Sequence, residues 1–149
     1  MSNDEINVLQ NGLLDGIKVV EFGGKVSAPY CGLTLSGLGA EVIKVESLNG
    51  DISRKIGPFP TDKTDTEMSA LYLALNRGKK SVTADFKIPS DLEALKNLVS
   101  TAEVIIENCS FGFLSKHGLD YRALSKVNPN LIYVSISPFG DNGPYSSYL

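Results

Sequence analysis

Short apolar segments alternate with segments of helical pattern along most of this chain, and this alternation restricts the fold more than any other feature. Strand-like runs occupy residues 17–22, 41–46, 80–86, 103–108 and 131–137. Strands that alternate with helices form βαβ units, whose strands run parallel and whose crossovers are right-handed. The pattern predicts an α/β fold built on a parallel sheet.

The segments between the strands carry helix signals. Pro29 suits the first position of a helix, because its missing N–H is not needed there, and Gly39 can end that helix. Residues 67–76 predict a second helix. A third opens on "SDLEALKNLVSTA", where Ser90 and Glu93 predict a capping box. Two short helices follow, in "FGFLSKHG" and "DYRALSKVN".

Two stretches show no helix or strand pattern. Residues 1–13 read as a loose leader. Residues 47–66 have no usable period and many Gly, Pro and Asp residues. A loop of that length in a compact domain is usually functional or mobile.

Composition limits the class of protein. The chain has 149 residues and a net charge of −3, which makes one ordinary domain without the basic excess of a nucleic-acid-binding protein. It carries no signal-peptide pattern and no apolar stretch near the roughly 20 residues of a membrane span. Cys31 and Cys109 form no CxxC pattern and read as reduced thiols. We expect a cytoplasmic protein with no nucleic-acid or membrane partner.

Polar and charged side chains follow several of the predicted strands. Asp85 and Lys87 close one strand, Glu46 another and Asn108 a third. Because the carboxyl ends of parallel strands meet at one edge of a sheet, these residues predict a ligand crevice there. Taken singly, Lys79, Lys80 and Lys87 also fit the simpler interpretation of solvated surface charges.

Sequence motifs assign no catalytic group to that crevice. Glu46, at the end of the second strand, would suit a ribose hydroxyl of NAD, but the turn "GGKVSAP" lacks the GxGxxG pattern. No Walker A loop, nucleophile elbow or zinc spacing is present. The single histidine, His117, reads as a surface or helix-end residue. These motifs identify no catalytic residue and no metal site, and a Ser-His-Asp or Cys-His set stays open at this point.

Seven segments, in order over nearly the whole chain, resemble the family III CoA-transferases, the group of formyl-CoA transferase, the carnitine CoA-transferases and alpha-methylacyl-CoA racemase. They are "LLDGIKVVEFG", "APYCGLTLSGLGAEVIKVE", "GDISR", "LNRGKKSVTADFK", "AEVIIEN", "GLDYRALSKVNPNLIYVSISPFG" and "GPY". The resemblance implies that residues 14–149 are the incomplete N-terminal part of a Rossmann-like CoA-binding large domain, with helices on both faces of its sheet. The rest of that domain and a smaller second domain would be absent.

The resemblance also implies a set of residues that lie along coenzyme A, the acyl carrier and substrate. Lys87 and Lys116 are the cations expected near its phosphates. Ser47 stands where many relatives have a basic residue, so one phosphate contact is expected to be missing. The full set of expected CoA-binding residues is Val26, Ser27, Ser47, Ala84, Asp85, Phe86, Lys87, Asn108, Cys109, Ser110 and Lys116.

By the same resemblance, the complete enzyme moves CoA between an acyl-CoA and a carboxylic acid through a covalent aspartyl intermediate. Its nucleophilic aspartate would lie beyond Leu149, so this chain alone is expected to be inactive, and the full-length protein is expected to form a homodimer. Three alternatives stay open: an acyl-CoA racemase of the same family, a non-catalytic CoA-binding fragment, and an NAD-binding oxidoreductase domain.

Overall fold

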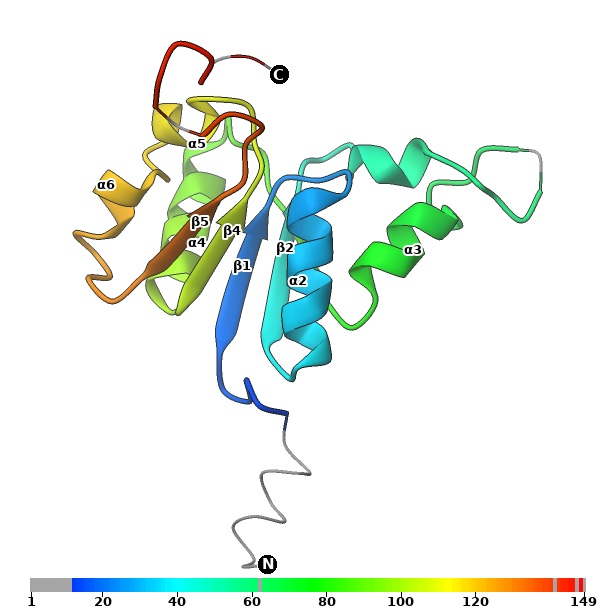
Figure 1. Ribbon diagram of the computed structural model, residues 1–149, viewed down its shortest axis with the longest axis horizontal. Coiled ribbons are helices and arrows are strands. Elements are labelled where there is room, and N and C mark those ends of the chain that lie inside the picture. Colours follow the sequence, from blue (N-terminus) through cyan, green and yellow to red (C-terminus); the bar gives the residue numbers. More distant parts are fainter. Residues whose placement is uncertain (1–11, 62, 141, 147, 149) are drawn as a thin grey trace, which may run out of the picture.

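A single parallel sheet forms the centre of the molecule (Figure 1). The computed structural model describes residues 12–61, 63–140, 142–146 and 148. The strand order is β3-β2-β1-β4-β5, and every printed pairing is parallel, as the sequence predicts. The strands are β1 (Lys18–Phe22), β2 (Glu41–Glu46), β3 (Lys80–Thr83), β4 (Val104–Glu107) and β5 (Ile132–Ser135).

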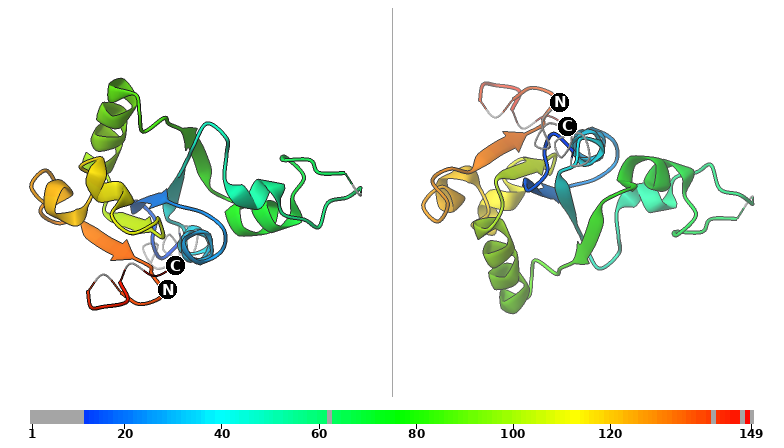
Figure 2. Two further views of the ribbon diagram at one scale, coloured as in Figure 1. Left: turned by 90° about the horizontal axis from the view of Figure 1, so that it is seen from above. Right: turned by 90° about the horizontal axis from the view of Figure 1, so that it is seen from below.

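Helices cover both faces of the sheet, which confirms the predicted fold class (Figure 2). Helix α2 (Ser27–Gly37) lies on one face, and α3 (Ala70–Asn76) packs beside it. Helices α4 (Pro89–Ser100), α5 (Phe113–Lys116) and α6 (Tyr121–Leu124) lie on the other face.

Successive strand residues point to opposite faces, so the sheet has two cores. Val19, Val42 and Ile106 pack under α2 with Ala28. On the other face, Val20, Phe22, Val45 and Ile105 pack with apolar side chains of α4, α5 and α6. Ile105 and Ile106 are both fully buried, so β4 is covered on both sides, as its apolar run predicts.

The strand predicted over residues 80–86 is shorter than expected. Strand β3 ends at Thr83, because the Asp85 side chain accepts a hydrogen bond from the Lys87 amide at 2.9 Å and turns the chain. The strand also lies at an edge of the sheet, and its four residues are exposed, Val82 included. Ala84 and Phe86, which follow the strand, join the α4-side core.

Three helix starts differ from the prediction. Helix α2 begins at Ser27, which puts Pro29 at its third position. Helix α3 begins at Ala70, capped by Ser69 Oγ, which accepts a hydrogen bond from the Tyr72 amide. The capping box in α4 is wrong: the helix begins at Pro89 with no side-chain cap.

The predicted long loop also contains one regular element, the 3₁₀-helix η1 (Ile52–Lys55), which Asp51 caps by accepting a hydrogen bond from the Ser53 amide. Beyond η1, residues 56–61 and 63–66 extend away from the sheet on the side of α3 (Figure 1).

Most of the predicted leader, residues 1–11, lies outside the described residues. Its end is held by the turn between α2 and β2: a Cβ on Gly12 would lie 2.6 Å from the Gly39 Cα, and the Leu14 amide donates to the Leu38 carbonyl at 2.9 Å. Within the described part of the chain, no helix has the length and apolar character that a membrane crossing requires.

Candidate functional site

A cavity of about 560 Å³ opens at the carboxyl ends of the strands. Its walls come from the loops that follow β1, β2, β4 and β5, and Ser146 and Tyr148 also line it. Strands β1 and β4 are neighbours at the point where the strand order reverses, and open α/β sheets bind ligands at such a point. The cavity is therefore the candidate functional site.

The predicted CoA-binding residues divide into two groups around this cavity. Those that line it are Ser27, Ser47, Phe86, Asn108, Cys109 and Ser110. Five others are not part of its lining: Val26, Ala84, Asp85, Lys87 and Lys116. Among these, Ala84 is buried in the core, whereas Lys87 and Lys116 are exposed at the same end of the sheet.

Asn108 ties two walls of the cavity together. Its Oδ1 accepts a hydrogen bond from the Gly24 amide at 3.0 Å, and its Nδ2 donates to the Gly24 carbonyl and to Ser27 Oγ, both at 2.8 Å. Gly23 has a φ of 108°, and a Cβ there would overlap Asn108 Oδ1. The turn after β1 therefore needs a glycine, and the Asn108 side chain is committed to holding that turn.

Aromatic rings form one side of the site. Phe86 lies with its ring centroid 5.0 Å from that of Phe113 and 5.2 Å from that of His117. His117 caps the carboxyl end of α5 with its backbone, but its ring is half-buried in this stack rather than solvated at the surface. Phe86, Phe111 and Phe113 all line the cavity.

Cys109 is a half-buried free thiol in the cavity wall, and Cys31 is a half-buried free thiol elsewhere. Burial, reinforced by the negative charge of Glu107, raises the pKa of Cys109 to about 12. The thiol is therefore protonated at neutral pH, and only the thiolate is a strong nucleophile. Cys109 is suited to packing rather than to covalent chemistry.

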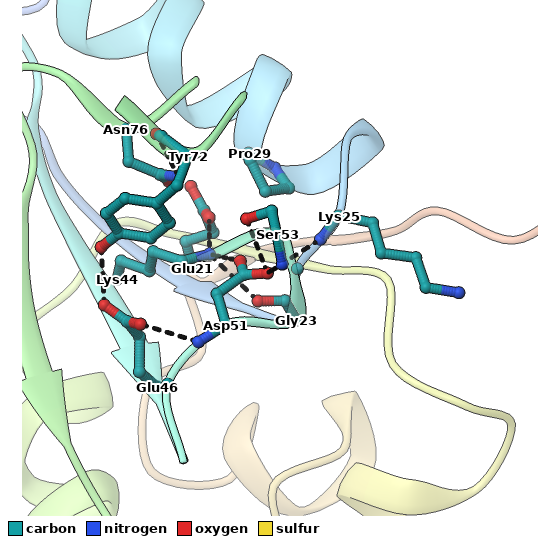
Figure 3. A network of polar contacts seen from close by, with 12 residues as sticks. Glu21, Gly23, Lys25, Pro29, Lys44, Glu46, Asp51, Ser53, Tyr72 and Asn76 are labelled. Carbon is teal, nitrogen blue, oxygen red and sulfur yellow. Dashed lines mark hydrogen bonds and ion pairs between the residues drawn. The ribbon is translucent and has the colours of Figure 1, made fainter. Parts of the chain in front are cut away.

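A buried network of charged side chains lies directly behind the cavity wall (Figure 3). Lys44 Nζ lies 2.9 Å from Glu21 Oε1 and 2.8 Å from Asp51 Oδ2, and all three side chains are at most 1% exposed. The contact with Asp51 Oδ2 is an ion pair without regular hydrogen-bond geometry. Burial alone would lower the pKa of Lys44, but the two carboxylates outweigh it and raise that pKa.

Lys79 belongs to the same network, which corrects its interpretation as a surface charge. Its side chain is 1% exposed, and Nζ lies 2.7 Å from Glu21 Oε2, 2.8 Å from the Pro29 carbonyl oxygen and 3.0 Å from Asn76 Oδ1. Burial lowers the pKa of Lys79. Lys80, in contrast, is exposed as expected and pairs with Glu41.

Glu46 has its carboxylate fully occupied by protein groups. Arg54 contacts both oxygens, at 2.7 and 2.9 Å, and Tyr72 and Ser81 each donate to Oε1 at 2.7 Å. Burial would raise the pKa of Glu46, but the hydrogen bonds from these three residues and from the Asp51 amide lower it to about 2. Glu46 therefore has no free oxygen for a ribose hydroxyl, which removes the observation that favoured NAD.

The network fixes the backbone of the cavity wall. Lys44 Nζ donates to the Gly23 carbonyl at 3.1 Å, and Asp51 Oδ1 accepts a hydrogen bond from the Lys25 amide at 3.2 Å. Sequence reasoning missed this arrangement. The one sequence signal for the network is that Glu21 and Lys44 interrupt otherwise apolar strands. In the structure, these two residues stand opposite each other in the register of β1 and β2.

The site thus offers binding rather than acid–base chemistry. Its lining joins backbone amides and hydroxyls to an aromatic side. Both of its described carboxylates are neutralised, Asp51 by the buried Lys44 and Glu46 by the partly buried Arg54. Among the described residues, no group of His, Cys, Asp or Glu has the arrangement of a metal site.

Comparison with known proteins identifies the family. The sequence model of CoA-transferase family III matches residues 14–149. The succinate–glutarate CoA-transferase of Agrobacterium fabrum is 44% identical over 138 residues, which are 91% of this chain and 34% of that protein. The succinyl-CoA:glutarate CoA-transferase of Homo sapiens is 38% identical over 134 residues, or 89% of this chain and 30% of that protein.

A solved structure has the same fold at close similarity. A CAIB/BAIF family protein from Brucella suis superimposes with a TM-score of 0.85 and 48% identity, covering 93% of this chain and 37% of that one. The chain therefore spans about a third of the length of the relatives it matches. The seven motifs, the parallel sheet and these matches agree: the chain belongs to CoA-transferase family III.

Proposed function

We propose that this chain supplies the CoA-binding part of an enzyme that moves coenzyme A between an acyl-CoA and a carboxylic acid. The observation that carries the proposal is the coincidence of family membership with a cavity at the point of strand reversal. Coenzyme A is a polyanion with an aromatic base. A cavity with an aromatic side and no uncompensated described carboxylate suits such a ligand.

The proposed substrates are dicarboxylic acids. Relatives of this chain are named as CoA-transferases of succinate and glutarate in Agrobacterium fabrum and of mesaconate in Haloarcula hispanica. Each of these acids carries a second carboxylate that stays free when the first is joined to CoA. We infer the same substrate class for the present protein.

The proposed reaction is covalent catalysis by an aspartate outside these 149 residues. The carboxylate attacks the thioester carbonyl, expels CoA thiolate and forms a mixed anhydride. The thiolate then attacks the aspartyl carbonyl, releasing the first acid and leaving an aspartyl-CoA thioester. The acceptor acid repeats these steps in reverse, so that it leaves as its own CoA ester and the aspartate is regenerated.

In this proposal the present chain positions CoA rather than performing the chemistry. Holding the carrier in one orientation turns an encounter in solution into a reaction between neighbouring groups. A homodimer, expected from the resemblance, and a cytoplasmic location, expected from the composition and motifs of the sequence, belong to the same proposal.

Ligand titration tests the binding role. Isothermal titration calorimetry of the chain with CoA is expected to show one saturable site, whereas NAD at the same concentrations is expected to give no heat of binding. Binding of NAD without binding of CoA would contradict the proposal.

Activity tests the placement of the aspartate. With succinyl-CoA and glutarate, the 149-residue chain is expected to form no glutaryl-CoA, because its described cavity offers no free carboxylate. Glutaryl-CoA formed by this chain alone would show that the nucleophile lies within it.

A further inference from the structure

Lys25 is the one charged residue in the described cavity lining that has no charged partner. The other two, Glu46 and Asp51, are held by Arg54 and Lys44. No described carboxylate lies within ion-pair distance of Lys25, and its side chain extends away from Asp51 (Figure 3). We propose that the Lys25 ammonium binds the free carboxylate of a dicarboxylic acyl group, an inference that rests on the proposed function.

The backbone of Lys25 marks it as a functional position. Its φ is 61°, and it is the only non-glycine residue with a positive φ among those that the structure describes. Such a conformation costs about 1 kcal/mol and persists where the surroundings enforce it. Here Asp51 Oδ1 accepts a hydrogen bond from the Lys25 amide, and Lys44 Nζ donates to the carbonyl of Gly23, two residues earlier. The buried network thus holds a strained turn that presents a lysine at the cavity.

The position of Lys25 in the fold separates it from the two lysines expected near phosphate. Lys87 and Lys116 are sequence neighbours of Phe86 and His117, which stack together on the α4 side of the sheet. Lys25 leads into α2, on the opposite face. If the nucleotide end of CoA lies at the aromatic side, Lys25 faces the other end of the carrier, where the acyl group is joined.

The charge on the acyl group then decides recognition. Succinyl-CoA and butyryl-CoA have acyl chains of equal length, but only succinyl-CoA ends in a carboxylate. A partly exposed ammonium–carboxylate pair favours the charged ligand by about fivefold in affinity. Lys25 would therefore make the site selective for dicarboxylic over monocarboxylic acyl groups.

The test compares binding of succinyl-CoA, butyryl-CoA and CoA to the 149-residue chain by calorimetry. The unaltered protein is expected to bind succinyl-CoA about fivefold more tightly than butyryl-CoA. Lys25→Met is expected to abolish that preference without weakening the binding of CoA or butyryl-CoA, and Lys25→Arg to retain most of it. Lys87→Met is the matched control and is expected to keep the preference. Circular dichroism checks that each variant folds.

The outcomes separate this inference from the proposed function. If Lys25→Met weakens all three ligands equally, Lys25 contacts a part common to them, such as a phosphate, and the carboxylate assignment is wrong. If the unaltered protein binds CoA but shows no preference, or Lys25→Met keeps it, the inference fails while CoA binding stands. If the unaltered protein binds none of the three, the proposed function fails and this inference fails with it.

Discussion

Two sets of charges occupy the same end of the sheet, and they differ in how completely the protein neutralises them. Behind the cavity wall, Lys44 and Lys79 are 1% exposed and bonded to Glu21 and Asp51. In the wall itself, Lys25 is exposed and without a described carboxylate partner. The buried ions hold the wall of the site in place, whereas the exposed ion stays accessible to a ligand.

The difference has a physical cause. A buried charge is tolerated only when it is paired and hydrogen-bonded, so Lys44 and Lys79 are tied to fixed partners. An exposed lysine keeps its hydration and can exchange water for a ligand anion at little cost. A lysine side chain thus stabilises the fold where it is buried and can bind a ligand where it is exposed.

Replacing Lys44, the central cation of the buried network, is expected to have the largest effect on stability. Lys44→Met leaves Glu21 and Asp51 with less compensation in the interior and is expected to lower the free energy of unfolding by about 4 kcal/mol. Urea denaturation followed by circular dichroism measures it. The control Lys80→Met removes a surface pair with Glu41 and is expected to cost less than about 1 kcal/mol. Equal losses in the two variants would show that burial does not distinguish these ion pairs.

Acid is expected to lower the free energy of unfolding through protonation of Glu46, the carboxylate that Arg54 holds. Its pKa falls from 4.5 to about 2 on folding, so its contribution is complete above pH 4.5 and is lost as the pH falls from there toward 2. Between pH 6 and pH 3 the loss is about 2 kcal/mol. Glu46→Gln, less stable at neutral pH, is expected to show a correspondingly shallower fall in unfolding free energy over that range. If the unfolding free energy of both proteins falls equally over this range, Glu46 is not the group responsible for the acid sensitivity.

Gly24 precedes Lys25 in the cavity wall and lies against the buried Asp51 carboxylate, so a methyl group added there tests how the buried ions support the wall. The Cβ would lie 2.7 Å from both carboxylate oxygens of Asp51, which Lys44 holds in place. We expect Gly24→Ala to cost about 2 kcal/mol and to weaken CoA binding, measured by urea denaturation and calorimetry. At Gly37 an added Cβ meets nothing within 4 Å, so Gly37→Ala is the control. Unchanged CoA affinity in Gly24→Ala would mean that this wall does not shape the ligand site.

The smallest effect is expected at the strained turn itself. Lys25→Gly keeps the backbone at a φ of 61° without its steric cost and is expected to raise the thermal midpoint slightly, by the equivalent of about 0.5–1 kcal/mol. Differential scanning calorimetry measures it, with Lys55→Gly as the exposed lysine control. A fall in stability as large as that of Lys55→Gly would show that the turn stores no strain.

The sheet could be predicted from the sequence because its signal is local. Apolar runs such as residues 103–108 and the glycine-marked turns give strand number and order along the chain, and the βαβ rule then gives parallel pairing. Ends of elements were less accurate: the Asp85 turn shortens β3, and Asp91 bonds the Asp85 amide at 2.9 Å where a capping box was expected.

The site could be predicted only in part, because its decisive contacts are long-range. Phe86 and Asn108, which the resemblance places along CoA, line the cavity. Lys79, in contrast, binds Glu21 across 58 residues of sequence, and Glu46 binds Ser81 across 35. These partners become visible only when the register of neighbouring strands is known. Lys25 carries no sequence signal at all, since its importance comes from a backbone conformation.

One measurement tests most directly whether the cavity at the carboxyl ends of β1 and β4 binds CoA. The 149-residue chain, labelled with ¹⁵N, is titrated with CoA while its amide resonances are followed by NMR. We expect the largest shifts at the Gly24, Lys25 and Ser27 amides and at residues 108–110, which line the cavity. Shifts confined to the outer surface around Lys87 and Lys116, or no shifts at saturating CoA, would contradict it.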